Sequence, residues 1–154
     1  MFKFAIIVCL FAIAACSKIS PLKSSAYEVT GSSTERIANV LAIVTKHQAP
    51  PTALLDAHFL EEQIGDDVFG PSDFQAFFLI RVAPQDISRW MQIFKPLGVK
   101  AEYYAPVQPR DWWVTRDAFT SLQFYKPDIL TGAVHGWIGV SQQTGSIYIF
   151  TFTM

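Results

Sequence analysis

The stretch VHGWIGVSQQTGSIYIFTFT, residues 134–153, has the pattern of a β-hairpin. Its apolar residues predict strands near 134–141 and 146–153, and the turn QQTG between them suits a type I turn with Gly145 in the left-handed region. The second strand alternates between two largely apolar faces, one with Tyr148, Phe150 and Phe152 and the other with Ile147, Ile149 and Thr151. We therefore expect this strand to be covered on both sides or central in its sheet.

Other parts of the chain predict further strands. AFFLIRV, residues 76–82, is apolar, partly β-branched and bounded by turn residues, which predicts a strand over 74–82. Residues 54–63 could form a helix on propensity alone, but we expect a partner strand over 57–64, joined to it by the turn region GDDVFGPSD. We also expect a short strand over 122–125.

Two segments predict helices. Residues 32–47 place apolar side chains at three- and four-residue spacing, and Pro50 prevents the helix from continuing much further. Residues 84–94 begin with Pro84, which is favoured at the first helical position. Together with the strands, these helices predict an α+β fold, in which a small antiparallel sheet carries two or three packed helices and ends in a C-terminal β-hairpin.

The N-terminus has the layout of a secretory signal. Residues 4–15, FAIIVCLFAIAA, are apolar throughout and follow Lys3. Roughly 18 or more apolar residues are needed to cross a bilayer, so this run is too short to span one comfortably. A short-spanning anchor or a buried N-terminal helix is the alternative.

The end of that apolar run resembles the lipobox of bacterial lipoprotein precursors. Ile13, Ala14 and Ala15 precede Cys16, although the family usually has leucine where Ile13 stands. The resemblance covers residues 1–16 and implies that Cys16 is lipidated after the chain is cut before it. Acyl chains such as palmitate contribute about 0.8 kcal/mol per buried methylene, which holds such proteins on a membrane.

This resemblance predicts the organisation of the chain. Residues 1–15 are the expected signal peptide, residues 16–33 the lipidated cysteine and a flexible serine-rich tether, and residues 34–154 a single globular domain. We expect a membrane-anchored lipoprotein of the cell envelope that faces the periplasm from the inner or the outer membrane. The C-terminal aromatic hairpin resembles that of uncharacterised bacterial proteins, which implies no activity.

The composition excludes several functions. The chain has 154 residues and a formal charge of −1, and no basic residues cluster, so we expect no nucleic-acid partner. Removal of the signal peptide leaves Cys16 as the remaining cysteine. The sequence has no G-x-S-x-G elbow and no glycine-rich phosphate loop. We therefore expect a protein that is not an enzyme and that needs neither a cofactor nor a metal.

The chain has three histidines that are candidates for a catalytic or metal-binding role. His47 ends the first predicted helix, where a cation suits the helix dipole. On a strand, His58 would share a face with Leu60 and Glu62, so an acid–base or metal pair is geometrically possible there. His135 stands at a strand start, where it could bond a backbone carbonyl or serve catalysis.

Acidic residues cluster at the turn after the first predicted strand. They are Glu61, Glu62, Asp66, Asp67 and Asp73. Their spacing lacks the alternation of a calcium loop, so they form either a solvated turn or a patch for a basic partner.

The segment VKAEYYAPVQPRDWWVTR, residues 99–116, predicts an aromatic loop with the composition of a recognition surface. Tryptophan, tyrosine and arginine dominate the energetic centres of protein interfaces. The candidate binding residues are Tyr103, Tyr104, Arg110, Trp112 and Trp113. One tryptophan of the adjacent pair could instead point inward and close the core, because neighbours on an extended chain point opposite ways.

These features support three functional hypotheses. The first is a non-catalytic envelope lipoprotein that binds another protein, as an accessory subunit or as an inhibitor of the immunity type. The second is a cell-wall glycan binder that uses Trp112 and Trp113. The third is a small hydrolase that uses His58 or His135 with a carboxylate.

Overall fold

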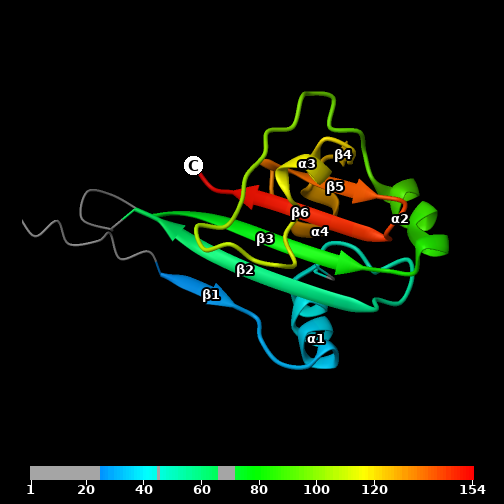
Figure 1. The fold of residues 1–154 in the computed structure, drawn as a ribbon, viewed down its shortest axis with the longest axis horizontal. Helices are drawn as coiled ribbons and strands as arrows, with labels where there is room; N and C mark the ends of the chain where they lie inside the picture. Colours follow the sequence, from blue (N-terminus) through cyan, green and yellow to red (C-terminus); the bar gives the residue numbers. More distant parts are fainter. Residues whose placement is uncertain (1–24, 45, 66–71) are drawn as a thin grey trace, which may run out of the picture.

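The computed structural model describes residues 25–44, 46–65 and 72–154 (Figure 1). Within these ranges, six strands form one antiparallel sheet in the order β1-β2-β3-β6-β5-β4. The strands are β1 (Ala26–Glu28), β2 (Asp56–Ile64), β3 (Asp73–Arg81), β4 (Gln123–Tyr125), β5 (Gly136–Ser141) and β6 (Ser146–Phe152). The helices are α1 (Ser33–Val44), the 3-10 turn η1 (Pro84–Asp86), α2 (Ile87–Ile93), α3 (Arg116–Phe119) and α4 (Asp128–Thr131).

The predicted α+β class is wrong, because the described part of the chain is mostly β. The sheet is the dominant element and not a small one, and of the described helices α1 has 12 residues while none of the others exceeds seven. Helices α1, α2 and α4 cover one face of the sheet, whereas largely irregular chain and the short α3 cover the other. An antiparallel sheet was predicted, but its extent was underestimated, because β1 lay in the predicted tether and no local pattern shows how many strands join one sheet.

β6 is central, as its two apolar faces predicted. It lies between β3 and β5, and Ile147, Ile149 and Phe150 are each at most 1% exposed. The C-terminal hairpin is present, with Ser141 opposite Ser146 and Gly145 in the left-handed region at a φ of 66°. A side chain on Gly145 would lie 2.2 Å from the carbonyl oxygen of Val82, so glycine is required there for space as well as for φ.

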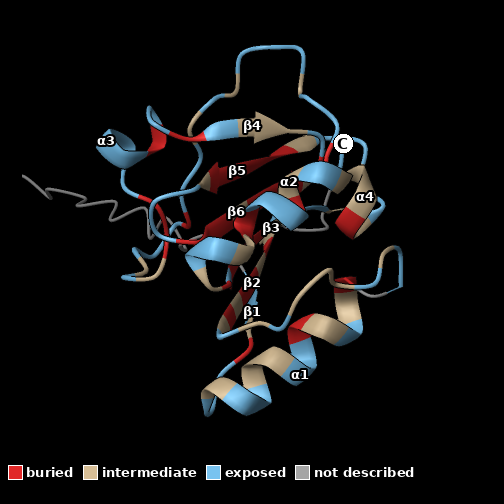
Figure 2. Cartoon of the chain, turned by 90° about the vertical axis from the view of Figure 1, so that its right-hand side faces the viewer, coloured by how far each residue is buried: buried red, intermediate tan, exposed pale blue. Residues whose placement is uncertain are grey.

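The helices pack on one face of the sheet and bury its first core. α1 contributes Val40 and Val44, α2 contributes Ile87 and Trp90, and α4 contributes Leu130. The inward sides of these helices are buried and their outward sides are exposed (Figure 2). The strand residues of this core are Ala57, Phe59, Phe78, Ile80, Ile138, Val140, Ile147 and Ile149.

The chain between α2 and β4 covers the opposite face and buries a second core. The segment of residues 99–116 and α3 pack over this face with little regular structure (Figure 1). The buried side chains of this second core are Leu60, Phe77, Trp113, Val114, Phe119, Leu122, Trp137 and Phe150. A loop rich in proline and aromatic residues therefore covers this face of the sheet, as the helices cover the other.

The sheet begins inside the segment that the sequence assigned to a tether. Residues 26–28, within the predicted tether 16–33, form β1, and Ala26 and Glu28 lie opposite Glu62 and Leu60 of β2. A strand of three residues is too short for its alternation to be recognised in a sequence. The predicted signal peptide and Cys16 lie outside the described residues. Among the residues that are described, no helix is both long and apolar enough to span a membrane.

The two-sided burial of β6 makes a stability prediction. We expect Phe150→Ala to lower the free energy of unfolding by about 3–5 kcal/mol, because it removes a buried ring from the second core. Phe74→Ala, at a position that is 39% exposed, should cost about 1 kcal/mol or less. Urea unfolding of the purified full chain measures both values, and equal losses would contradict this account of the core.

Candidate functional site

Trp113 closes the second core and is not a surface residue. It is 6% exposed, and its ring packs edge-on against Phe77 at a centroid distance of 5.1 Å. Its Nε1–H donates to the carbonyl oxygen of Tyr104 at 2.8 Å, which satisfies the polar atom that burial would otherwise leave unpaired. Trp113 is therefore the tryptophan of the adjacent pair that points inward, which was the alternative to a binding role for both rings.

The two predicted tyrosines have different surroundings. The hydroxyl of Tyr103 donates to the carbonyl oxygen of Val114 at 3.0 Å, and the guanidinium of Arg116 lies 4.6 Å from the ring centroid. Tyr104 stacks on Phe150 at 4.4 Å with an interplanar angle of 12°, and it remains 39% exposed. Tyr104 is therefore the most accessible ring among the predicted binding residues.

Arg110 and Trp112 attach the aromatic segment to the first strand. The guanidinium of Arg110 reaches the carboxylate of Glu28 through Nε at 3.0 Å and through Nη2 at 2.9 Å. Trp112 Nε1–H donates to the same carboxylate at 3.3 Å. Both predicted binding residues therefore make hydrogen bonds within the domain, and both donate to the carboxylate of Glu28.

A buried carboxylate holds the segment at a second point. Glu62 is 4% exposed and accepts hydrogen bonds from the backbone N–H of Val107 at 3.1 and 3.3 Å. The amide of Gln75 donates to the same carboxylate at 2.9 Å. Glu28 and Glu62 thus fix the irregular chain in one conformation over the sheet.

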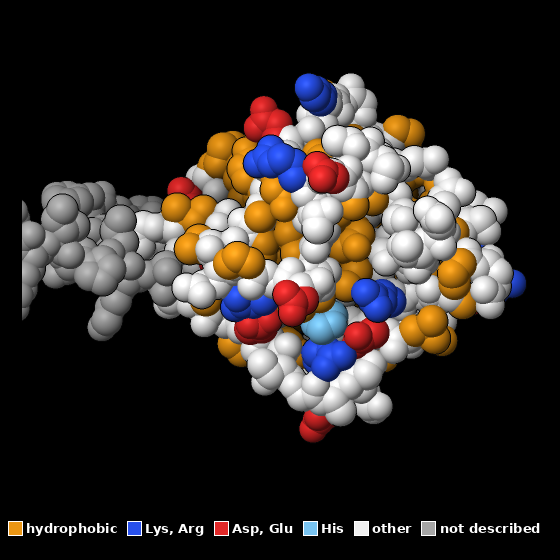
Figure 3. Space-filling model, in the orientation of Figure 1, with side chains coloured by type: hydrophobic (Ala, Val, Ile, Leu, Met, Phe, Trp, Pro, Cys, Tyr) orange, Lys and Arg blue, Asp and Glu red, His pale blue; other side chains and the backbone are white. Residues whose placement is uncertain are grey.

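The aromatic segment, held at these points, forms a groove of about 320 Å³. Two arginines, Arg110 and Arg116, and the rings of Tyr103 and Trp113 belong to its wall. The other lining residues are Ala105, Pro106, Pro109, Val114 and Thr115. We call this the aromatic groove. In Figure 3, apolar side chains form the middle of this face, with charged side chains above and below them.

A histidine–carboxylate pair lies beside the groove on β2. His58 Nε2 is 3.3 Å from Asp56 Oδ2, and the His58 ring stacks on Trp112 at 5.1 Å and 16°. Asp56 Oδ1 accepts hydrogen bonds from Arg36 at 2.6 Å and from Ser33 Oγ at 3.0 Å. Among the described residues, the other ring nitrogen of His58 has no hydrogen-bond partner, so the pair has the arrangement of an oriented base.

The surroundings of the pair keep both side chains in defined charge states. Burial lowers the pKa of His58 below its ordinary value of 6.5, and Arg36 acts in the same direction against the attraction of Asp56. Burial raises the pKa of Asp56, but hydrogen bonds from Arg36, Ala57 and Ser33 outweigh it and hold this pKa below the ordinary 3.8. A neutral imidazole therefore faces an ionised carboxylate near pH 7, and His58 Nε2–H donates to Asp56.

The remaining candidates are not brought together. His58 and Glu62 share a face of β2, as predicted, but His58 pairs with Asp56, while Glu62 binds Val107. His135 is exposed, with its ring 5.4 Å from that of Phe152. Exposed His47 follows α1.

The predicted acidic cluster is not one continuous patch. Glu61 and Glu62 point to opposite faces of β2, and Asp73 is exposed at the start of β3. Asp66 and Asp67 lie outside the described residues. Across the described ranges, no three histidine, cysteine, aspartate or glutamate side chains come close enough together to hold a metal ion.

The sequence did not reveal the carboxylates that organise this site. Glu28 lay in the predicted tether, and Glu62 belonged to a cluster interpreted as a solvated turn or a surface patch. The available signal was the alternation of β2, which places Glu62 on the same face as Leu60, a residue of the second core.

Comparisons with known proteins do not identify the chain. No family model, no curated protein and no solved structure matches it. The site must therefore be interpreted from its own geometry.

The buried carboxylate of Glu62 makes a second prediction. We expect Glu62→Ala to lower the free energy of unfolding by about 1–3 kcal/mol, because the N–H of Val107 and the amide of Gln75 lose their acceptor. Limited proteolysis should cut the released segment faster. Glu61→Ala, on the opposite face of the same strand, is the control, and an equal loss there would show that Glu62 has no special role.

The histidine–carboxylate pair makes a prediction about pH. Because the pKa of His58 is lowered in the folded state, the stability gained from its neutral form is complete above about pH 6.5 and is lost as the pH falls through the folded pKa. His58→Gln should therefore flatten the decline in the urea midpoint between about pH 7 and pH 5. His47→Gln, at an exposed position, should leave the decline unchanged, and an unchanged slope in His58→Gln would contradict the assignment.

Proposed function

We propose that this chain is a membrane-anchored lipoprotein of the cell envelope whose domain binds another protein without acting on it chemically. An accessory subunit and an inhibitor of the immunity type are two forms of this function. The observation that carries the proposal is the aromatic groove, a recess of about 320 Å³ on the broad face of the domain.

The composition of the groove supports protein recognition. Its wall combines tyrosine, tryptophan and arginine with two prolines, and these aromatic and arginine residues are enriched at the energetic centres of interfaces. A protein partner could insert a few side chains into a recess of this size. The wall residues belong to one continuous segment, so a single loop carries the whole surface.

The groove is also held in place before a partner arrives. Glu28 binds Arg110 through two nitrogens, and Glu62 binds the backbone of Val107. Because these bonds already restrict the loop, less conformational entropy is lost on binding. Because these bonds fix the walls of the groove, we expect a rigid recognition surface and not an adaptable one.

Arg116 supplies a charge that a partner can use. Its side chain is at an exposed position over the ring of Tyr103, and it forms no ion pair with any described residue. A carboxylate of the partner would gain a charge-assisted hydrogen bond there. We infer that the partner presents an acidic residue beside apolar ones.

The membrane anchor rests on the lipobox resemblance at residues 13–16. A lipidated Cys16 would restrict the domain to the surface of a membrane, so the partner is expected at that surface or within reach of it.

The glycan alternative is less well supported. Sugar binding by Trp112 and Trp113 requires exposed flat rings, but Trp113 is 6% exposed and the two rings are perpendicular, at 89°. The Asp56–His58 pair keeps a second candidate, acid–base chemistry, open to test. A hydrolase using this pair would lose its activity in His58→Gln, whereas a binding domain would keep its partner.

The proposal is tested by photo-crosslinking in living cells. A photoreactive amino acid in place of Thr115, an exposed groove residue, should crosslink one defined protein, and the same probe in place of Ser88 on α2 should not. Arg116→Glu should then lower the crosslinking yield about tenfold or more, which corresponds to the loss of one charge-assisted contact. Arg89→Glu, at an exposed position of α2, should have no effect.

Two outcomes would contradict the proposal. Crosslinks of equal yield from positions 115 and 88 would show that the groove has no preference for a partner. Wild-type yield in Arg116→Glu would show that the groove charge takes no part in binding. The double change Trp112→Ala and Trp113→Ala is unsuitable here, because Trp113 belongs to the second core.

A further inference from the structure

One end of the sheet gathers the exposed apolar side chains of the domain. At this end β1 begins opposite Glu62, and β2 finishes beside the start of β3, where Ile64 pairs with Asp73. β6 ends and β5 begins here as well, with Gly136 opposite Thr151. We call it the apolar end.

The apolar end holds almost all large apolar side chains that the described residues expose. These are Tyr27, Leu55, Ile64, Phe74, Val99, Tyr104, Val107, Val134 and Met154. All except Leu55 lie at or next to this end: Val99 lines a groove with Phe152, and Val107 is bonded to Glu62. In Figure 3, several orange side chains lie among white ones on the left part of the described molecule.

The opposite end of the sheet is polar. β2 begins there with Asp56, β3 finishes with Arg81, and the turn of residues 142–145 consists of Gln, Gln, Thr and Gly. Among the large apolar side chains that the described residues expose, Leu55, at 61%, is the one at that end. The sheet therefore has one apolar end and one polar end.

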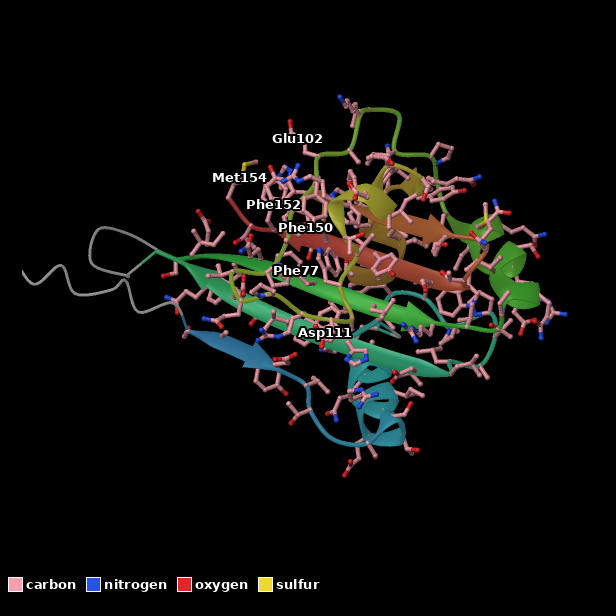
Figure 4. The ribbon with its side chains drawn as sticks, in the orientation of Figure 1. Phe77, Glu102, Asp111, Phe150, Phe152 and Met154 are labelled. Carbon is pink, nitrogen blue, oxygen red and sulfur yellow. The ribbon has the colours of Figure 1, made fainter. Side chains whose placement is uncertain are left out.

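The apolar end is not a flat surface, because it contains a second groove of about 240 Å³. Val99, Tyr104 and Phe152 line it, and the rings of Trp137 and Phe150 also contribute. Figure 4 shows Glu102, Met154 and Phe152 near one another at this end, with Phe150 and Phe77 following towards the core. Apolar chains inserted here would contact aromatic rings.

The chain enters the domain at this same end. The backbone of Ser25 accepts a hydrogen bond from Gln63 N–H at 2.9 Å, next to Ile64. Eight residues, 17–24, separate Ser25 from Cys16, so the two Cα atoms cannot be more than about 32 Å apart. Cys16 is therefore held much closer to the folded domain than it would be if residues 16–33 were all a tether.

We propose that the apolar end of the sheet lies against the lipid bilayer. This inference rests on the lipid anchoring of Cys16 in the proposed function. The short connection places the apolar end next to the membrane, and the side chains of Ile64, Val134 and Met154 enter the interfacial region. The aromatic groove, on the broad face, stays accessible to a protein partner.

The charges at this end fit a neutral lipid surface. Lys100 and Glu102 line the second groove together, and Asp73 is exposed nearby. Since the described residues at this end include no basic cluster, binding depends on apolar contact and not on anionic headgroups. A covalent anchor makes this contact intramolecular, so weak apolar contacts are sufficient to orient the domain.

The experiment uses the full chain, expressed with its signal, purified after processing and reconstituted into phosphatidylcholine vesicles. Single-cysteine variants Ile64→Cys and Val134→Cys carry an environment-sensitive fluorophore, and Leu55→Cys is the matched control at the polar end. Vesicle flotation reports anchoring. Quenching of the fluorophore by nitroxide-labelled lipids reports distance from the bilayer. We expect quenching at positions 64 and 134 to exceed that at position 55 at least threefold.

A second pair of variants separates orientation from anchoring. Val134→Glu introduces a charge into the apolar end, so quenching at position 64 should fall while the protein still floats with the vesicles. Leu55→Glu should change neither measurement. Both variants alter exposed positions, so the fold should persist.

Each outcome decides between the two proposals. Flotation with equal quenching at the three positions would overturn the bilayer contact and leave the anchor standing. Failure to float would contradict both the anchor and the contact that depends on it. Shielding of positions 64 and 134 that appears only after envelope proteins are added would assign the apolar end to a protein partner and overturn the proposal.

Discussion

The burial of β6 on both faces is the constraint on which the rest of this structure depends. Ile147 and Ile149 on one side and Phe150 on the other are at most 1% exposed, so the sheet needs a cover on each face. Helices supply one cover. Irregular chain supplies the other, and its polar backbone must be satisfied without a regular ladder. Glu62, which bonds Val107 N–H, and the indole N–H of Trp113, which bonds Tyr104, meet this requirement at two places.

The same requirement shapes the candidate binding surface. Residues that a sequence reader would assign to recognition are partly used to hold the aromatic segment in place: Arg110 binds Glu28 and Trp112 stacks on His58. What remains accessible is a groove whose walls are fixed by those bonds. Stability and the proposed recognition therefore share one segment, and much of its interface-like composition is used inside the fold.

The two proposals assign different faces to different partners. The aromatic groove lies on the broad face of the sheet, and the apolar end lies where β1 begins and β6 finishes (Figure 1). A domain held by this end would present its broad face sideways, at a limited height above the membrane. That geometry suits a partner that is itself attached to the membrane, because both proteins would then meet in a thin layer.

Local patterns were enough to locate most strands and helices. Apolar runs bounded by turn residues placed β3 and the β5–β6 hairpin, and the two apolar faces of β6 predicted its central place. The spacing of apolar residues placed α1, because these signals come from neighbours in the chain. The fold class and the role of the aromatic segment required tertiary contacts. Arg110 donates a hydrogen bond to Glu28, which lies 82 residues earlier in the chain. No local sequence pattern indicates such a pair. The sequence alone determined which residues are apolar and at what spacing they recur. The tertiary structure decided which of them lie in a core, in the wall of the groove or at the exposed end. The reason is that burial depends on which other parts of the chain pack over each side chain.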